Sequence, residues 1–150
     1  MTPEQVRLVQ ESFRRIAPQG EAVAQTFYDR LFALDPALRP LFTGEMRQQR
    51  RKLMAMLALA VEALEHPGAL APILRTLGWR HFTYGVQPRH FATAGDALLA
   101  ALGEHLGAAF DRAMRAAWTG CYVLVATAML DGMREAGERA EAAAITGMAA

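Results

Sequence analysis

The chain has 150 residues, which is enough for one domain with a full hydrophobic core. Its formal net charge is only +1, so no extended basic face is available for nucleic-acid phosphates, and nucleic acid is not expected as a partner. The longest uncharged apolar stretch, residues 116–130, is shorter than the roughly 18 residues expected of a membrane-spanning helix. Because the N-terminus also lacks a signal-peptide pattern, composition predicts a cytoplasmic protein without membrane insertion.

The first part of the chain has clear helix start and stop signals. Apolar residues recur with a 3.6-residue period and no alternating β-branched run occurs, which predicts an all-α protein. Residues 2–5 (Thr-Pro-Glu-Gln) form a capping-box pattern, so a first helix should run to about Ala17. A second helix is expected over residues 21–34, and Asp35 then caps a short helix that ends near Phe42.

Two further helices are expected in the middle of the chain. The first covers residues 46–64 and is apolar around nearly its whole circumference beyond Leu53, which predicts a helix enclosed on most sides. The second follows a break at residues 66–68. It places His81 on the same face as its leucines, at offsets of 0, 3, 4, 7 and 11 for Leu70, Ile73, Leu74, Leu77 and His81.

The last part of the chain is expected to form two helices, over residues 88–106 and 108–135, after a break at residues 85–88. We predict a domain over residues 1–136 and a separate alanine-rich tail over residues 137–150. The single cysteine, Cys121, lies in an apolar stretch and is expected to be a buried, unreactive thiol. The sequence does not predict an oligomeric state.

Three polar residues stand in apolar helix faces: Tyr28, Gln49 and His81. Burying such groups without partners costs about 1–3 kcal/mol each, so something must satisfy them. A histidine in this position is either a hydrogen-bonded core imidazole or the ligand of a buried metal or haem. A tyrosine hydroxyl and a glutamine NH₂ suit the second interpretation, because both can donate to a bound dioxygen that carries partial negative charge. The remaining histidines, His66, His90 and His105, are expected at surface or capping positions.

Several short segments together resemble a known family. In chain order they are residues 27–32 (Phe-Tyr-Asp-Arg-Leu-Phe), 40–42 (Pro-Leu-Phe), 49–50 (Gln-Arg), 78–81 (Gly-Trp-Arg-His), 85–88 (Gly-Val-Gln-Pro), 117–118 (Ala-Trp) and Tyr122. Over residues 3–130 the chain is similar to bacterial single-domain haemoglobins, to the globin domain of flavohaemoglobins and to the Vitreoscilla type. The resemblance implies a globin fold, a three-on-three helical sandwich around haem, with haem b as cofactor.

The resemblance also implies a role for individual residues. His81 would be the proximal iron ligand and therefore the metal site, while Tyr28 and Gln49 would hydrogen-bond the bound gas. The remaining expectations concern the haem surroundings: Phe42 stacks on the porphyrin, Leu53 forms an apolar gate beside the gas, Val86 and Phe91 touch the haem edge, and Lys52, Arg51 or Arg80 reaches a propionate. Ordinary solvated surface charge is the alternative for these three basic residues.

The resemblance leaves the activity open among three functions. The first is reversible binding of dioxygen and other small gases at a five-coordinate iron. The second is nitric oxide dioxygenation, which flavohaemoglobins perform through a reductase domain that follows their globin; this chain ends where that domain would begin and would need a separate reductase. The third is a haem-free sensor or interaction module with a globin fold.

One departure from the flavohaemoglobin pattern bears on this choice. In that family a tyrosine and a glutamate hydrogen-bond around the proximal histidine, which increases electron donation toward bound oxygen. Ungapped counting places Phe91 and Met133 at those positions. We therefore expect His81 to donate its N–H to a backbone carbonyl near Leu77, and the iron to be tuned toward reversible binding.

Overall fold

The computed structural model describes the backbone of residues 1–149 and the side chains of residues 1–147. This part of the chain contains helices and no strand, which confirms the all-α prediction. The elements, in chain order, are α1 (Pro3–Ile16), η1 (Ala17–Gln19), α2 (Gly20–Leu34), η2 (Pro36–Leu41), α3 (Met46–Glu62), η3 (Ala63–Glu65), α4 (Pro67–Thr83), α5 (His90–Leu106), η4 (Gly107–Ala109) and α6 (Arg112–Ala149).

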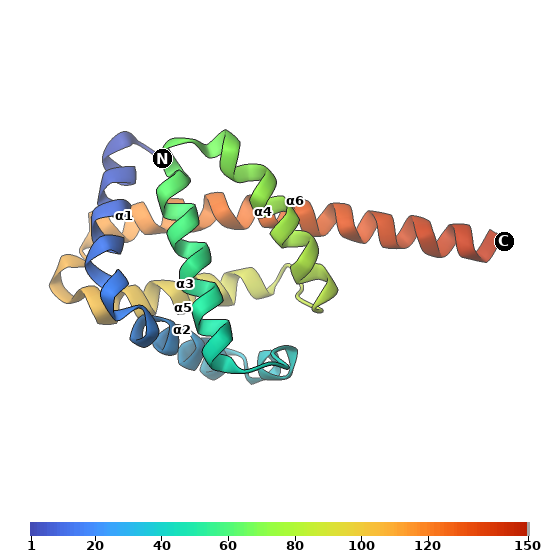
Figure 1. Cartoon of the computed structure of the whole chain (residues 1–150), viewed down its shortest axis with the longest axis horizontal. Helices are drawn as coiled ribbons and strands as arrows, with labels where there is room; N and C mark the ends of the chain where they lie inside the picture. The colour runs from blue at the N-terminus through green and yellow to red at the C-terminus, as the bar shows by residue number, and fades with distance from the viewer. Residues whose placement is uncertain (150) are drawn as a thin grey trace.

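The long helices form two crossing layers. In Figure 1, α1, α3 and α4 run steeply across the view, and α2, α5 and α6 run along it. Helix α6 packs against α1, α4 and α5, and α2 packs against α3 and α5. This arrangement is the three-on-three helical sandwich that the sequence predicts.

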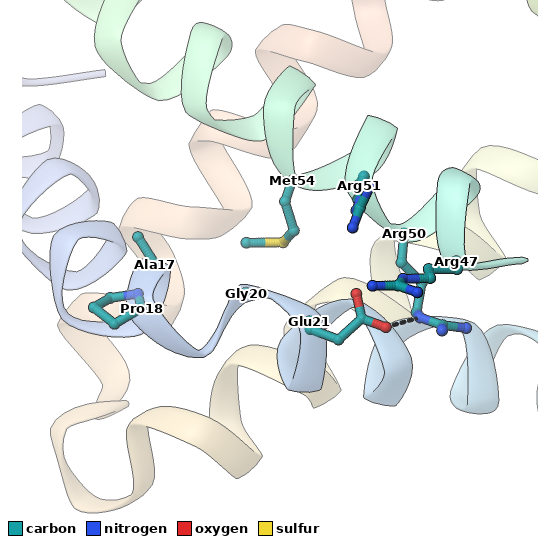
Figure 2. A pocket seen from close by; sticks show the side chains of 8 residues that line it. All are labelled: Ala17, Pro18, Gly20, Glu21, Arg47, Arg50, Arg51 and Met54. Atoms are coloured by element: carbon teal, nitrogen blue, oxygen red, sulfur yellow. Dashed lines mark hydrogen bonds and ion pairs between the residues drawn. The ribbon is translucent and has the colours of Figure 1, made fainter.

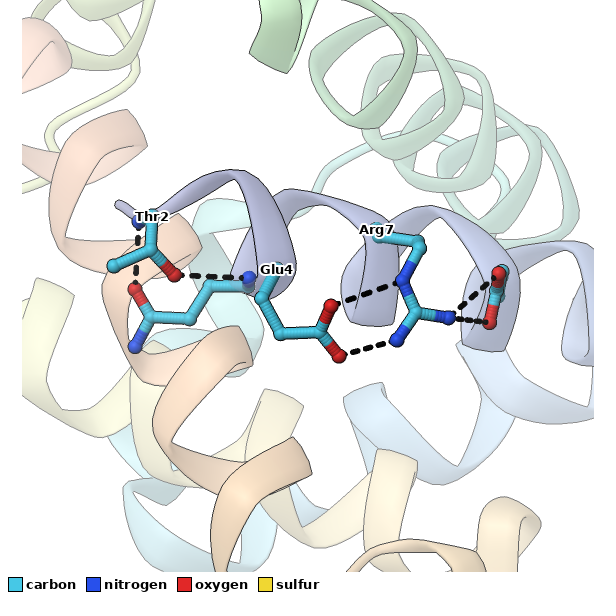
Figure 3. A network of polar contacts seen from close by, with 5 residues as sticks. Thr2, Glu4 and Arg7 are labelled. Atoms are coloured by element: carbon cyan, nitrogen blue, oxygen red, sulfur yellow. Dashed lines mark hydrogen bonds and ion pairs between the residues drawn. The ribbon is translucent and has the colours of Figure 1, made fainter.

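The N-terminus of α1 forms as its sequence predicts. The Thr2 hydroxyl accepts the Gln5 N–H at 3.1 Å, and the Gln5 side chain accepts the Thr2 N–H at 3.0 Å (Figure 3). Arg7 pairs with Glu4 and Glu11 on the exposed face of the helix. The capping box satisfies the N–H groups of Thr2 and Gln5 at the start of the helix, and the buried residues of α1 lie on its opposite face.

A buried polar contact ties α1 to α6. The Trp118 indole N–H donates to the Ser12 hydroxyl at 2.9 Å, and that hydroxyl donates to the Val9 carbonyl at 3.0 Å. Both Ser12 and Trp118 are fully shielded from solvent. The hydroxyl is therefore the group that satisfies the indole N–H inside the core.

Replacing Ser12 by alanine is expected to lower the free energy of unfolding by about 1–3 kcal/mol, because the buried indole N–H then loses its acceptor. Urea unfolding of the variant measures the loss. Thr119→Ala is the matched control, since the exposed Thr119 hydroxyl donates only to the Arg115 carbonyl of its own helix. Equal stability of the two variants would show that the Ser12 contact contributes nothing.

Helix α3 differs from its prediction. It ends at Glu62, and η3 follows. Of its residues only Ala60 and Val61 are buried, while Leu59 is 40% exposed, so the expectation of a helix enclosed on most sides is wrong. The physical reason is that α3 packs on α1 and α2 but makes little contact with α4 beyond the η3 connection. Much of its apolar surface is left half-buried.

Helix α6 is longer than predicted and continues without a break through residue 149. The predicted tail is thus helical in its described part, exposed over residues 138–147, and projects beyond the other helices in Figure 1. By length and composition α6 is apolar enough to cross a membrane, but its first half buries Trp118, Cys121 and Met129 in the core. Cys121 is buried as expected, and burial raises the pKa of its thiol to about 12.

Candidate functional site

The geometry of His81 fixes its protonation. Its Nδ1 lies 2.8 Å from the Leu77 carbonyl oxygen, one helical turn earlier, as expected from the sequence. Because a carbonyl oxygen only accepts, Nδ1 must carry the proton. Burial lowers the pKa of His81 and the Leu77 hydrogen bond opposes that shift, so the imidazole is neutral near pH 7. Its Nε2 therefore presents a lone pair, and no described residue hydrogen-bonds to that atom.

A tight helix crossing holds the turn that precedes His81. A Cβ atom on Gly78 would lie 2.0 Å from the Met129 carbonyl oxygen, and one on Gly132 would lie 2.0 Å from the Arg75 carbonyl oxygen. The backbones of α4 and α6 are thus in direct contact at two points. This contact fixes α4, and with it His81, against the longest helix of the molecule.

The chain turns sharply after α4. The His81 carbonyl accepts the Val86 N–H at 3.1 Å, and Gly85 between them has φ of 89°. That left-handed conformation favours glycine, because a Cβ atom would be strained there. The turn brings the half-buried Val86 back beside the end of α4.

Tyr28 of α2 lies in an aromatic cluster with side chains of the same helix and of the segment that follows it. It is 5% exposed, and its ring centroid is 4.9 Å from Phe27, 5.9 Å from Phe32 and 5.5 Å from Phe42. Burial raises the pKa of the Tyr28 phenol, and a side-chain hydrogen bond with Gln49 opposes the shift. The phenol is therefore neutral and able to donate a proton.

The apolar residues predicted around the haem divide between two hydrophobic clusters. Phe42 and Leu53 pack against the cluster that contains Tyr28, whereas Phe91, together with Leu77, packs against the second cluster. All four of these side chains are only half-buried. Helix α3 contributes to both clusters, through Leu53, Met54 and Leu57 to the first and through Met56 and Ala60 to the second.

The two residues that depart from the flavohaemoglobin pattern also have apolar surroundings in the structure. Phe91 packs among hydrophobic residues, and Met133 is 4% exposed. Tyr122, whose role the sequence analysis missed, donates its hydroxyl proton to the Phe91 carbonyl at 2.6 Å. Its ring packs against Gly95, where a Cβ atom would lie 2.8 Å from it. A tyrosine in an apolar helix face was the available signal, as it was for Tyr28.

The basic residues expected to bind a haem propionate make no contact in the structure that supports this expectation. Lys52 is exposed, and no ion pair forms between it and a described residue. Arg51 and Arg80 are exposed as well. Propionate binding by these residues therefore stays a prediction.

The other histidines have structural partners or are exposed. His90 is buried, and its Nδ1 accepts the Gln87 N–H at 2.9 Å, which makes it a capping residue as expected. His105 lies 2.9 Å from the Thr26 hydroxyl, and His66 is exposed. His81 differs from these histidines because its engaged nitrogen bonds a backbone carbonyl one turn earlier in the middle of the predicted site, which leaves Nε2 as the atom that can bind a ligand.

The described residues contain no group of three or more His, Cys, Asp or Glu side chains that could hold a metal ion. A metal at His81 would therefore need a cofactor that brings its own ligands, as the four nitrogens of a porphyrin do. The residues present fit such a group: one neutral imidazole with a free Nε2 and half-buried apolar side chains that a flat apolar ring can cover.

The sequence profile of the Globin family matches residues 25–129 of this chain. The chain belongs to the globin family. This globin is 32% identical over 125 residues to a flavohemoprotein of Bordetella parapertussis and 31% identical over 143 residues to one of Deinococcus radiodurans. The matches cover 81% and 91% of the globin described here but only 31% and 36% of these relatives.

Solved structures show the same fold. A bacterial globin from Campylobacter jejuni superimposes with a TM-score of 0.81 at 22% identity, covering 91% of this globin and 99% of that chain. An engineered carbene transferase from Rhodothermus marinus, named as a candidate nitric oxide dioxygenase, gives 0.82 at 24% identity and covers 96% and 99%. Membership in the globin family and the similarity to flavohemoproteins imply binding of haem and of small gases.

Proposed function

We propose that this globin holds haem b through His81 and reversibly binds dioxygen, with Tyr28 and Gln49 as the residues that retain the gas. One observation carries the proposal: the His81 imidazole is neutral, its Nδ1 is engaged by Leu77, and its Nε2 is free. The His81 ring is half-buried, so a flat cofactor can reach the open Nε2 from the solvent side. When bound, the haem supplies an iron with one open coordination position for the gas.

Two side chains of this globin provide the hydrogen-bond donors for the bound gas. Tyr28 donates from a phenol whose pKa is raised by burial, so the proton stays on the oxygen at neutral pH. Gln49 is close enough to the phenol to oppose the burial shift of its pKa, and its NH₂ group is the second donor. A dioxygen molecule with partial negative charge is therefore retained by donors placed in a largely apolar cluster.

The partner of His81 favours reversible binding over oxygen activation. A carboxylate on Nδ1–H would raise the basicity of the imidazole, whereas a backbone carbonyl does so less. The acceptor is the neutral Leu77 carbonyl. Of the two carboxylates that lie two residues from the aligned position, Asp131 and Glu135, Glu135 pairs with Arg75 and neither is a hydrogen-bond partner of His81. We therefore place dioxygen retention ahead of nitric oxide dioxygenation for this chain.

Replacing Tyr28 by phenylalanine is expected to speed dioxygen release. Loss of one charge-assisted hydrogen bond, roughly 1.5–3 kcal/mol, corresponds to about a 10- to 150-fold change in affinity. Stopped-flow displacement of dioxygen from the ferrous protein measures the release rate. Tyr84→Phe is the matched control, because the same atom is removed from a tyrosine that is 61% exposed. An unchanged release rate in Tyr28→Phe would remove Tyr28 from the mechanism.

A further inference from the structure

A cavity of about 670 Å³ lies between the start of α2 and the first turns of α3. Figure 2 shows that Ala17 and Pro18 of the η1 turn flank it, and that side chains of α3 face the start of α2 across it; it is open to solvent. Of the residues expected to contact haem or dioxygen, only Arg51, one of the three candidates for a propionate, lines it. It is an open groove, so it suits a ligand that stays partly in solvent rather than one that is enclosed.

Three arginines line this cavity from one face of α3. Arg47, Arg50 and Arg51 are spaced as neighbours on a helix surface. Within the described part of the chain, Arg47 and Arg51 have no ion pair. With Glu21 as the one acidic lining residue, the formal charge of the cavity is three minus one, or +2.

Glu21 holds the third arginine in place. Its carboxylate Oε1 is 2.5 Å from Nε of Arg50, whose side chain is 19% exposed. The bond engages Nε and leaves the two terminal NH₂ groups of Arg50 for another acceptor. Arg50 is thus an ordered cation rather than a freely solvated one.

The remaining wall is apolar. Ala17, Pro18 and Met54 line it, and the Met54 side chain packs close to Gly20. The cavity therefore matches a ligand that carries at least two negative charges on a compact head and has room for a less polar portion. Guanidinium groups bind phosphate oxygens in a paired geometry, and several guanidiniums within one helical turn suit a phosphate better than a single carboxylate.

We propose that this cavity binds a small molecule bearing a phosphate or diphosphate group. Arg47 and Arg51 contact the phosphate oxygens, and Arg50 joins them through its terminal NH₂ groups. The site shares only Arg51 with the residues expected around the haem. The haem absorption of each variant therefore separates failure of this site from failure of haem and dioxygen binding.

The test is calorimetric titration of the purified haem-loaded protein with inorganic pyrophosphate and, separately, with adenosine diphosphate at low ionic strength. We expect saturable binding at one site. Arg47→Gln with Arg51→Gln should weaken it by about tenfold or more for each arginine lost. The matched control is Arg112→Gln with Arg115→Gln, because these exposed arginines lie on α6 outside the cavity and should leave the affinity unchanged.

Glu21→Gln tests the geometry in the opposite direction. The substitution removes the negative charge beside Arg50, so pyrophosphate should bind several-fold more tightly, a gain that loss of structure cannot produce. Tighter binding of adenosine diphosphate than of pyrophosphate would assign a nucleotide-like ligand that uses the apolar wall, and equal binding would assign the diphosphate group alone. No saturable binding below about 10 mM, equal weakening by the control pair, or binding of a polyglutamate peptide alone would overturn the proposal.

Discussion

Replacing His81 by glycine is expected to lower haem affinity by more than the roughly 10- to 100-fold that loss of a residue supporting a metal ligand typically costs. His81 offers the neutral Nε2 lone pair to the iron, and the described residues provide no cluster of metal ligands to replace it. The space left by the ring should admit free imidazole. Haem titration followed by absorption measures the affinity, and added imidazole should restore the five-coordinate ferrous spectrum.

The control for this prediction is His66→Gly, since His66 is exposed and lies at the start of α4 rather than near its end. That variant should bind haem like the parent protein. Circular dichroism distinguishes lost coordination from lost folding. Unchanged haem affinity and spectrum in His81→Gly would show that another residue holds the iron.

The second large effect is expected at the crossing of α4 and α6. In Gly132→Ala the new Cβ would lie 2.0 Å from the Arg75 carbonyl oxygen, a distance that real atoms do not adopt. The helices must separate, and we expect the free energy of unfolding to fall by about 3 kcal/mol or more, at the upper end of the usual cost of overpacking. Urea unfolding of the haem-free protein measures this loss without a contribution from cofactor binding.

Gly147→Ala is the matched control on the same helix, because a Cβ there meets nothing within 4 Å. Alanine is the better helix former by about 1 kcal/mol, so this control should be neutral or slightly stabilising. Because the two substitutions are expected to change the free energy of unfolding in opposite directions, the comparison separates the effect of packing from that of helix propensity. If Gly132→Ala were as stable as the control, the close backbone contact would be wrong.

Gly78→Ala should also weaken haem binding, since it displaces the turn before His81.

Local signals explain why most of the fold could be predicted from the sequence. The capping box at Thr2, the cap at Asp35 and the positive-φ turn at Gly85 each depend on a few neighbouring residues. The same holds for the helical face that carries Tyr28, because burial follows the apolar period. The predicted face of His81 is only partly confirmed, since Leu70 and Leu74 are buried but Ile73 is 42% exposed.

Contacts between segments that are distant in the chain could not be predicted from the sequence. Nothing local indicates that Gly78 and Gly132 meet another backbone, or that Tyr122 donates to the Phe91 carbonyl. The exposure of α3 was mispredicted for the same reason, because an apolar pattern does not say which protein face covers it. The arginines of α3 follow a visible spacing, but their cavity exists only where the start of α2 faces them.

The absorption spectra of the purified protein in its ferric, ferrous and dioxygen-exposed forms test the haem and dioxygen assignment most directly. We predict a Soret band, a five-coordinate ferrous spectrum, and a change on adding dioxygen that reverses when the gas is removed. The first two follow from a single axial imidazole, His81, and the third from retention by Tyr28 and Gln49. Protein produced with ample haem that shows no Soret band, or a ferrous spectrum with two protein ligands on the iron, would contradict the assignment.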